Sequence, residues 1–369
     1  MKKILLVLLL FTVLTCFPFL LYPSVLVSRG NDLEEFFWPM IYFSKSQIIG
    51  SHSLPLWNPL FFSGMPLISD PQAPYFYIPN VIFLFFNLDP AFVISVFLHI
   101  FWASLGMYLL SKNIFRFSDK TNLFLSALYI FSPKLSAYIE AGHLGLIYSY
   151  AWLPWTLFLV VSLAKKPTIR KSIFLATCLS ALFFTHILIF LISIIVLLLI
   201  YTYTTLKYKT SLKRNLIYIL TTLVFNFCFM AIALLPQLEW SNQTTRFLLI
   251  ANKDIYPKWL GFSEFIKSST SPILYGYKYL WGLDTEKYTV IGIGVLVLST
   301  IGFLTLKKSN KIITCLIIST VMLIVLNNIS PINFFLLTQK WFSLIRVSTR
   351  FWFIVLFFIL YLAGLGFEK

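Results

Sequence analysis

Apolar runs of about 20 residues follow one another along most of the chain, separated by short polar segments. Such a run spans the hydrocarbon core of a bilayer as an α-helix. Hydrophobic residues make up 59% of the sequence and charged residues 11%, whereas a soluble domain carries about 25% charged residues. The runs do not alternate with polar residues, which excludes an outer-membrane β-barrel. The sequence therefore predicts an all-α, polytopic transmembrane helical bundle.

We expect about ten spans within a single module that covers residues 1–369. The predicted spans lie near residues 4–27, 91–110, 122–139, 146–164, 172–186, 189–206, 215–237, 289–306, 312–327 and 351–367. The first run is too long for the apolar region of a secretory signal peptide, so we interpret it as an uncleaved helix. Basic clusters flank residues 172–206 on both sides, which predicts a helical hairpin that turns at Thr185-His186.

The net charge of +16 at pH 7 indicates membrane orientation rather than a nucleic-acid partner. Polytopic membrane proteins enrich Lys and Arg in the loops on the cytoplasmic side. More than half of the 29 Lys and Arg residues fall in the short segments 1–3, 111–121, 165–171, 207–214, 307–311 and 368–369. We therefore predict a multi-pass protein of the cytoplasmic membrane with its N-terminus inside. The external loops are then 28–90, 238–288 and 328–350.

Two carboxylates, Asp32 and Glu34, form a D-x-E pair just after the first predicted helix, at the start of the longest external loop. Acidic residues are scarce, with 13 Asp and Glu in the whole chain, so a cluster of them is informative. The pair can hold a divalent cation such as Mg²⁺ or Mn²⁺, or one carboxylate can take a proton from a hydroxyl group. The alternative interpretation is a pair of solvated loop acids. Asp32 and Glu34 are our candidate catalytic and metal-binding residues.

Candidate substrate-binding residues lie in the same loops and at the outward helix ends. His143 lies in a glycine-containing turn, where a ligand can approach the backbone closely. It either hydrogen-bonds a phosphate or sugar or is an interfacial histidine in a turn that connects two helices. Asp70 either orients a substrate or caps a short helix. Arg346 and Arg350 would share one face of a helix, where they bind a phosphate group or anchor lipid head groups. The complete set is Trp57, Asn58, Asp70, Gln72, His143, Glu239, Arg246, Arg346 and Arg350.

Several short motifs follow one another in a recognisable order. The most specific stretch, residues 54–72, contains Leu54-Pro-Leu-Trp-Asn-Pro59, Gly64-Met-Pro66 and Asp70-Pro-Gln72. Weaker matches are Gly142-His143-Leu-Gly145 and Arg346-x-x-x-Arg350-Phe. Together with the acidic pair, these motifs resemble the YfhO-like bacterial membrane proteins, which belong with the GT-C type integral-membrane glycosyltransferases.

This resemblance implies a GT-C-like fold and an active site on the extracytoplasmic face. The implied reaction moves a sugar from a polyprenyl-phosphate donor to a cell-envelope glycan, lipid or teichoic-acid-like acceptor. In this class the catalytic carboxylate lies in the first external loop, so the role of general base falls on Asp32, with Glu34 as its partner. Members of this family are usually longer, with more spans and a soluble domain after the part matched here. This chain is therefore either a fragment or truncated product that lacks the C-terminal part of the family, or a compact relative.

Two other classes of function remain open from the sequence. A transporter or flippase of lipid-linked sugars predicts polar residues deep inside the spans, whereas we expect the ionisable residues of this chain at the outer edge. A noncatalytic scaffold subunit or an inactive fragment would leave the acidic pair unexplained. The four cysteines lie in apolar runs without C-x-x-C spacing, so neither a disulfide framework nor a zinc site is predicted.

Overall fold

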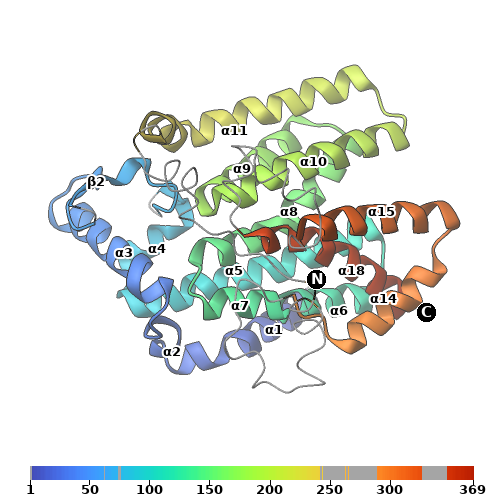
Figure 1. Ribbon diagram of the computed structural model, residues 1–369, viewed down its shortest axis with the longest axis horizontal. Helices are drawn as coiled ribbons and strands as arrows, with labels where there is room; N and C mark the ends of the chain where they lie inside the picture. Colours follow the sequence, from blue (N-terminus) through green and yellow to red (C-terminus); the bar gives the residue numbers. More distant parts are fainter. Residues whose placement is uncertain are drawn as a thin grey trace. The chain divides into compact units, whose positions relative to one another are not determined.

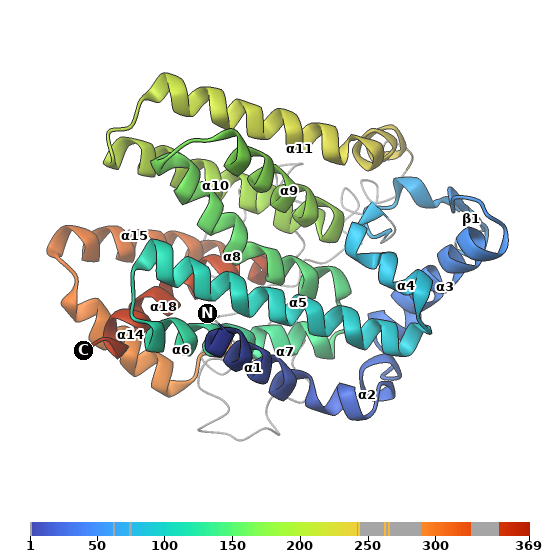
Figure 2. The ribbon, with the colours of Figure 1, turned by 180° about the vertical axis from the view of Figure 1, so that it is seen from behind.

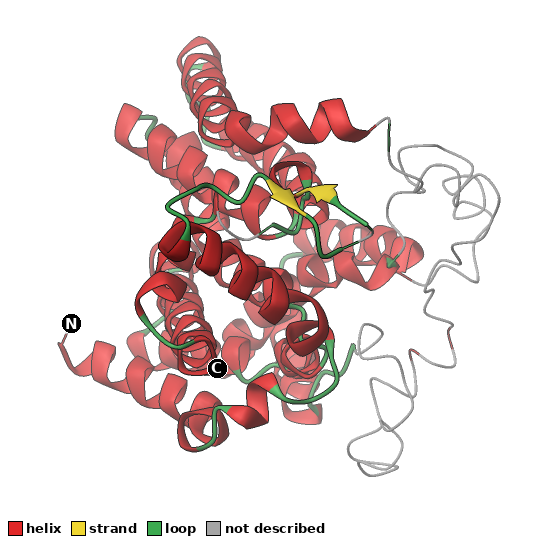
Figure 3. Cartoon of the chain, turned by 90° about the vertical axis from the view of Figure 1, so that its left-hand side faces the viewer, coloured by secondary structure: helices red, strands yellow, loops and turns green. Residues whose placement is uncertain are grey.

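The computed structural model describes residues 2–61, 63–73, 76–241, 243, 262, 265, 289–325 and 347–369. Most of these residues are helical (Figure 3). The others lie in two short strands and in loops and turns. The chain divides into two compact units, and each is described by itself. The first unit contains Met1–Ile114 and Ala141–Gln243, and the second contains Phe115–Glu140 and Thr244–Lys369.

Long apolar helices form the body of the first unit. They are α1 (Lys2–Leu21), α5 (Leu88–Leu110), α8 (Leu144–Lys165), α9 (Ile169–Thr185), α10 (Ile187–Lys207) and α11 (Leu212–Ser241). Helix α8 packs against α5, α9 and α10, and α9 also packs against α11. Figures 1 and 2 show α5 beside α8 from two opposite sides. The side chains of α8 are largely buried, so α8 is the central helix of this unit.

Seven helices of the described residues are long and apolar enough to cross a membrane. They are Lys2–Leu21, Leu88–Phe115, Leu144–Lys165, Ile187–Lys207, Leu212–Ser241, Lys308–Val325 and Ser348–Phe367. The prediction of an all-α, polytopic helical protein is therefore confirmed at this coarse level. Helix α9 has 17 residues and α14 (Ile293–Thr305) has 13, so two predicted spans correspond to shorter helices. The predicted turn at Thr185-His186 is confirmed, because α9 ends and α10 begins there.

The prediction of one continuous span over residues 122–139 is wrong. This stretch contains two helices, α6 (Asp119–Ile130) and α7 (Pro133–Glu140). Proline lacks a backbone N–H and disfavours the helical conformation of the residue before it, so Pro133 ends one helix and begins another. The hydroxyl of Ser132 accepts a hydrogen bond from the Leu135 N–H over 3.3 Å, which stabilises the start of α7.

The long loop after the first helix is folded, as the sequence predicted. Its elements are α2 (Ser24–Val27), η1 (Leu33–Phe37), α3 (Trp38–Lys45), η2 (Ser46–Gly50), β1 (Trp57–Asn58), β2 (Met65–Pro66), η3 (Leu67–Ser69), η5 (Ile78–Val81) and α4 (Ile82–Phe85). The two strands pair in antiparallel register, with Trp57 opposite Pro66. A small core of Met40, Phe43, Leu67 and Ala73 joins α3 to η3. This separate core explains why so long a connection has a defined structure.

The second unit is held together by a close contact between α14 and α18 (Trp352–Phe367). Gly302 of α14 lies against the backbone carbonyl of Leu362, and Gly366 of α18 lies against that of Leu298. Small residues allow this approach, because a side chain would separate the two backbones. Helix α15 (Lys308–Val325) also packs on α18. Glycine therefore determines the spacing of this helix pair.

We expect Gly302→Ala to destabilise the protein by about 1–3 kcal/mol, the usual cost of overpacking a tight contact. A Cβ at position 302 would collide with the carbonyl of Leu362, and a backbone atom cannot turn aside. Gly294→Ala, in the same helix, is the matched control because nothing lies within 4 Å of its added Cβ. Thermal unfolding of both variants in nanodiscs checks the difference. Equal midpoints for the two variants would contradict the close α14–α18 contact.

Candidate functional site

The structure brings Asp32 and His143 into direct contact within the first unit. Asp32 immediately precedes η1, and His143 immediately precedes α8. The Nε2 atom of His143 donates a hydrogen bond to the Oδ2 atom of Asp32 over 2.9 Å. The Asp32 side chain remains 57% exposed, whereas that of His143 is 19% exposed. The carboxylate is thus oriented by the imidazole and accessible to a ligand from solvent.

A glycine at position 142 permits this contact. Gly142 has a positive φ of 70°, a conformation that residues with a side chain rarely adopt. A Cβ there would lie 2.6 Å from the Oδ1 atom of Asn31 and would also collide with the Leu33 N–H. The same Asn31 oxygen accepts a hydrogen bond from the Leu33 N–H over 3.1 Å and so caps the first turn of η1. The turn before α8 therefore packs directly on the segment that carries Asp32.

Glu34 is directed to a different partner from Asp32. Its Oε2 atom accepts a hydrogen bond from the Gly30 N–H over 2.6 Å. The described residues contain no cluster of three or more His, Cys, Asp or Glu that could hold a metal ion. Asp32 and Glu34 each use one carboxylate oxygen for a separate partner. Their role as a Mg²⁺ or Mn²⁺ site remains a prediction.

The candidate residues of the stretch 54–72 have distinct environments. Asn58 is fully buried, and its Oδ1 atom accepts a hydrogen bond from the Leu60 N–H over 2.9 Å, so it shapes the turn after β1. Trp57 is 54% exposed, and its side chain lies against Gly64, the residue before β2. Asp70 ends η3, and its Oδ1 atom accepts from the Gln72 N–H over 2.8 Å. This bond closes the turn that follows η3, and the predicted substrate-orienting role of Asp70 remains a prediction.

Burial raises the pKa of the Asp70 carboxyl above its ordinary value, and the hydrogen bond from Gln72 lowers it by less. We therefore expect Asp70→Asn to raise the unfolding midpoint at neutral pH. The unfolded-state pKa of the Asp70 carboxyl is about 3.9, and the folded-state pKa is higher because burial disfavours the charged form. The stability of the wild type therefore falls as the pH rises from the lower of these pKa values through the higher one. Asn keeps the accepting oxygen without the charge. Below the unfolded-state pKa both forms are neutral, and the two midpoints should converge.

Thermal unfolding of wild type and Asp70→Asn across this pH range measures the predicted difference. Gln72→Glu is a useful control, because it adds an acid at an exposed neighbouring position while keeping the backbone N–H that Asp70 accepts from. A wild type that is more stable than Asp70→Asn at neutral pH would show that the charge of Asp70 stabilises the fold.

The remaining candidate residues are not part of the Asp32–His143 contact. Glu239 is exposed near the end of α11. Arg350 is half-buried on η9 (Ser348–Phe351) in the second unit. Arg246 and Arg346 lie outside the described residues. The phosphate-binding role of Arg346 and Arg350 and the substrate-binding role of Arg246 remain predictions.

A buried polar network beside α5 and α8 was not anticipated from the sequence. Tyr77, from the loop between α1 and α5, hydrogen-bonds through its hydroxyl to His99 Nε2 over 2.6 Å, and Trp152 Nε1 donates to the same hydroxyl over 2.6 Å. His99 Nδ1 lies 2.7 Å from the Ser95 carbonyl oxygen, and the His99 ring stacks on Tyr148 at 3.7 Å. His99 is buried in the middle of α5, so it is an exception to the expected clustering of ionisable residues at the outer edge.

The partners in this network fix its hydrogen-bond directions. A carbonyl oxygen can only accept, so His99 Nδ1 carries the proton and Nε2 accepts from the Tyr77 hydroxyl. The Tyr77 oxygen then accepts from Trp152. Burial also raises the pKa of Tyr77 well above its ordinary value, which keeps the phenol protonated. The signal available in the sequence was a histidine within an apolar helix, where a polar group needs a partner.

Comparison of the chain with protein-family models, curated proteins and solved structures found no match. Function is therefore inferred from the residues and their geometry. An exposed carboxylate that is oriented by an imidazole can remove a proton from a hydroxyl group held beside it. Of the candidate residues that the structure describes, only Asp32 and His143 are joined by a side-chain contact of this kind.

Proposed function

We propose that the chain is a membrane glycosyltransferase that moves a sugar from a polyprenyl-phosphate donor to a hydroxyl of a cell-envelope acceptor. The proposal places the reaction on the extracytoplasmic face of the cytoplasmic membrane. The observation that supports it best is the 2.9 Å contact between Asp32 and His143, two candidate residues from distant parts of the sequence. The polyprenyl-phosphate class of donor is supported by the resemblance of residues 54–72.

In the proposed reaction, Asp32 takes the proton of the acceptor hydroxyl. At the same time, the oxygen of that hydroxyl attacks the anomeric carbon of the donor sugar. A new bond forms between that oxygen and carbon, and the bond from the carbon to the donor phosphate oxygen breaks. Polyprenyl phosphate leaves with the electron pair, and direct displacement inverts the anomeric carbon. Asp32 later releases its proton to water. His143 acts as a positioning residue, because its Nε2–H fixes one carboxylate oxygen.

The test is donor consumption by the purified full chain in lipid nanodiscs. A panel of polyprenyl-phosphate sugars with different radiolabelled sugars would be supplied with and without a glycan or lipid acceptor. We expect release or transfer of at least one sugar. Sensitivity of this activity to chelator decides whether Asp32 and Glu34 hold a metal ion. A chain that is folded and consumes no donor in the panel would contradict the proposal.

A transporter or flippase of lipid-linked sugars is the second candidate, and the buried network around His99 favours it. Hydrogen-bonded polar side chains inside apolar helices mark substrate paths in many membrane proteins. Reconstitution in vesicles with a fluorescent lipid-linked sugar separates the two candidates. Movement of the label between leaflets without release of sugar would favour the transporter, whereas sugar release without movement would favour the transferase.

A further inference from the structure

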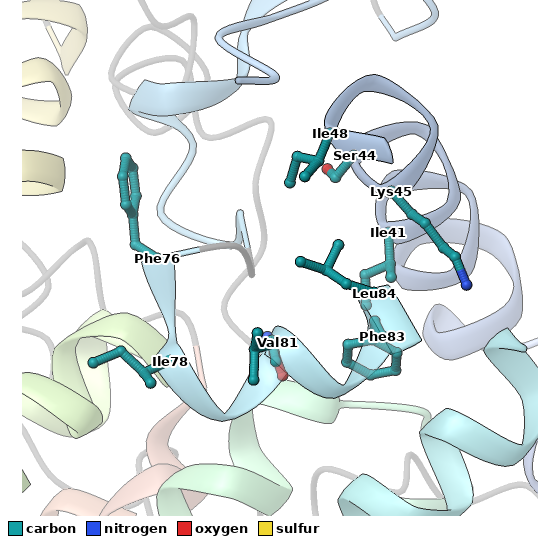
Figure 4. A pocket seen from close by; sticks show the side chains of 10 residues that line it. Ile41, Ser44, Lys45, Ile48, Phe76, Ile78, Val81, Phe83 and Leu84 are labelled. Atoms are coloured by element: carbon teal, nitrogen blue, oxygen red, sulfur yellow. The ribbon is translucent and has the colours of Figure 1, made fainter. Parts of the chain in front are cut away.

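The external loop of the first unit forms a half-open apolar cavity of about 340 Å³ (Figure 4). One wall comes from α3 and η2, and the other comes from residue 76, η5 and α4. Leu84 and Ile48 both project toward the open space that faces Phe76. The cavity is within the size range of ligand sites in proteins, about 300–1,000 Å³.

The lining of this cavity suits hydrocarbon rather than a sugar. Most lining residues are aliphatic or aromatic: Ile41, Ile48, Phe76, Ile78, Val81, Phe83 and Leu84. The polar lining residues are Ser44, Lys45 and Asn80. The hydroxyl of Ser44 donates to the Met40 carbonyl over 2.8 Å, so its proton is already used within α3. A sugar that entered this space would exchange its hydrogen bonds with water for apolar contacts, which is unfavourable. A hydrocarbon chain would gain by leaving water.

The wall formed by η5 and α4 also presents apolar side chains outward. Ile78 is 83% exposed, Val81 is 49% exposed, and Phe85 is 76% exposed. This segment leads after two residues into α5, whose helix is long and apolar enough to cross a membrane. Large exposed apolar side chains beside a transmembrane helix are typical of a segment that lies in the bilayer interface. The cavity is therefore next to a surface that lipid covers.

The positive charge of Lys45 gives this site a preference for an anionic ligand. Its stem lines the cavity, while its ammonium group points away and donates a hydrogen bond to the Phe86 carbonyl over 2.6 Å. An ammonium group has three donors, so this bond leaves donors for a phosphate oxygen. Lysines at membrane surfaces commonly bury the stem in apolar surroundings and keep the charge at the head-group layer. An anionic lipid has the same division between apolar chain and charged end.

We propose that this cavity binds the acyl chain of one anionic phospholipid from the surrounding bilayer, with its phosphate beside Lys45. The charge of Lys45 and the continuity of the cavity with the exposed surface of η5 and α4 identify the occupant. The proposal does not depend on the transferase activity. It assigns the external loop a lipid contact that holds α3 and α4 together at the membrane surface.

The test measures lipids retained by the full chain after release from nanodiscs of phosphatidylcholine that contain a minor fraction of phosphatidylglycerol. Native mass spectrometry would count the bound lipids. We expect one retained phosphatidylglycerol in the wild type and a clear loss in Leu84→Trp and Ile48→Trp, which fill the cavity from two elements. Phe85→Trp is the matched control, because Phe85 neighbours Leu84 and does not line the cavity. Lys45→Gln should weaken retention about fivefold, and Lys45→Arg should preserve it.

Equal retention by the wild type and both cavity-filling variants would overturn the proposal. Retention of phosphatidylcholine and phosphatidylglycerol without preference, unchanged in Lys45→Gln, would overturn the role of Lys45. A polyprenyl phosphate that displaces phosphatidylglycerol at equal mole fraction would show that a lipid carrier occupies the cavity instead. Unfolding midpoints close to that of the wild type verify that each variant is folded.

Discussion

Asp32→Asn is expected to lower sugar transfer by about 10²- to 10⁴-fold, the usual contribution of a general base. Asparagine has nearly the same shape as aspartate and can still accept a hydrogen bond from His143, but it cannot take a proton from the acceptor hydroxyl. Because Asp32 is 57% exposed, its substitution should leave the fold intact. Initial rates of transfer in nanodiscs, with equal amounts of folded protein, measure the effect.

The matched control for this variant is Glu35→Gln. Glu35 is an exposed acid in the same turn, and the same change of charge there should leave the rate within about threefold of the wild type. If Asp32→Asn and Glu35→Gln lowered the rate equally, the loss would come from the charge of the loop as a whole. If neither changed the rate, Asp32 would not be the base.

Gly142→Ala is expected to destabilise the protein by about 2–5 kcal/mol and to reduce transfer as well. About 1–2 kcal/mol comes from a side chain in the left-handed conformation at φ 70°, and about 1–3 kcal/mol comes from overpacking. The added Cβ would meet the Oδ1 atom of Asn31 at 2.6 Å, on the segment that carries Asp32. Relief of this clash would move the turn away and separate His143 from Asp32. Thermal unfolding and transfer rate measure the two effects.

Gly30→Ala separates the two contributions in this prediction. Gly30 also has a positive φ, at 61°, but nothing lies within 4 Å of its added Cβ. It should therefore cost only the conformational part, about 1–2 kcal/mol. A Gly142→Ala variant that is no less stable than Gly30→Ala would contradict the close approach of the two turns.

Features that depend on local sequence were predictable. Apolar runs with basic flanks indicated the helices, and Thr185-His186 was identified as the turn between α9 and α10. The split of residues 122–139 into α6 and α7 was also visible in the local sequence, because Pro133 cannot continue a helix. The apolar character of the whole stretch alone predicted one span.

Features that depend on tertiary contact were not predictable in the same way. Asp32 and His143 were each singled out, yet only the structure brings them together, because their contact requires two turns that are distant in the sequence. The same holds for Tyr77 and His99, whose hydrogen bond joins the loop between α1 and α5 to the middle of α5. Burial also changed the interpretation of Asn58, which shapes a turn and is covered by the chain itself.

The central claim is that Asp32 and His143 act as one unit in proton transfer. A double-mutant cycle of transfer rates with Asp32→Asn, His143→Gln and the double variant tests it most directly. His143→Gln alone should lower the rate about 10- to 100-fold, the equivalent of losing a hydrogen bond to a charged group. We expect the double variant to be no slower than Asp32→Asn, because His143 acts only through the carboxylate. Losses that multiply in the double variant would show that the two residues act independently and would contradict the account.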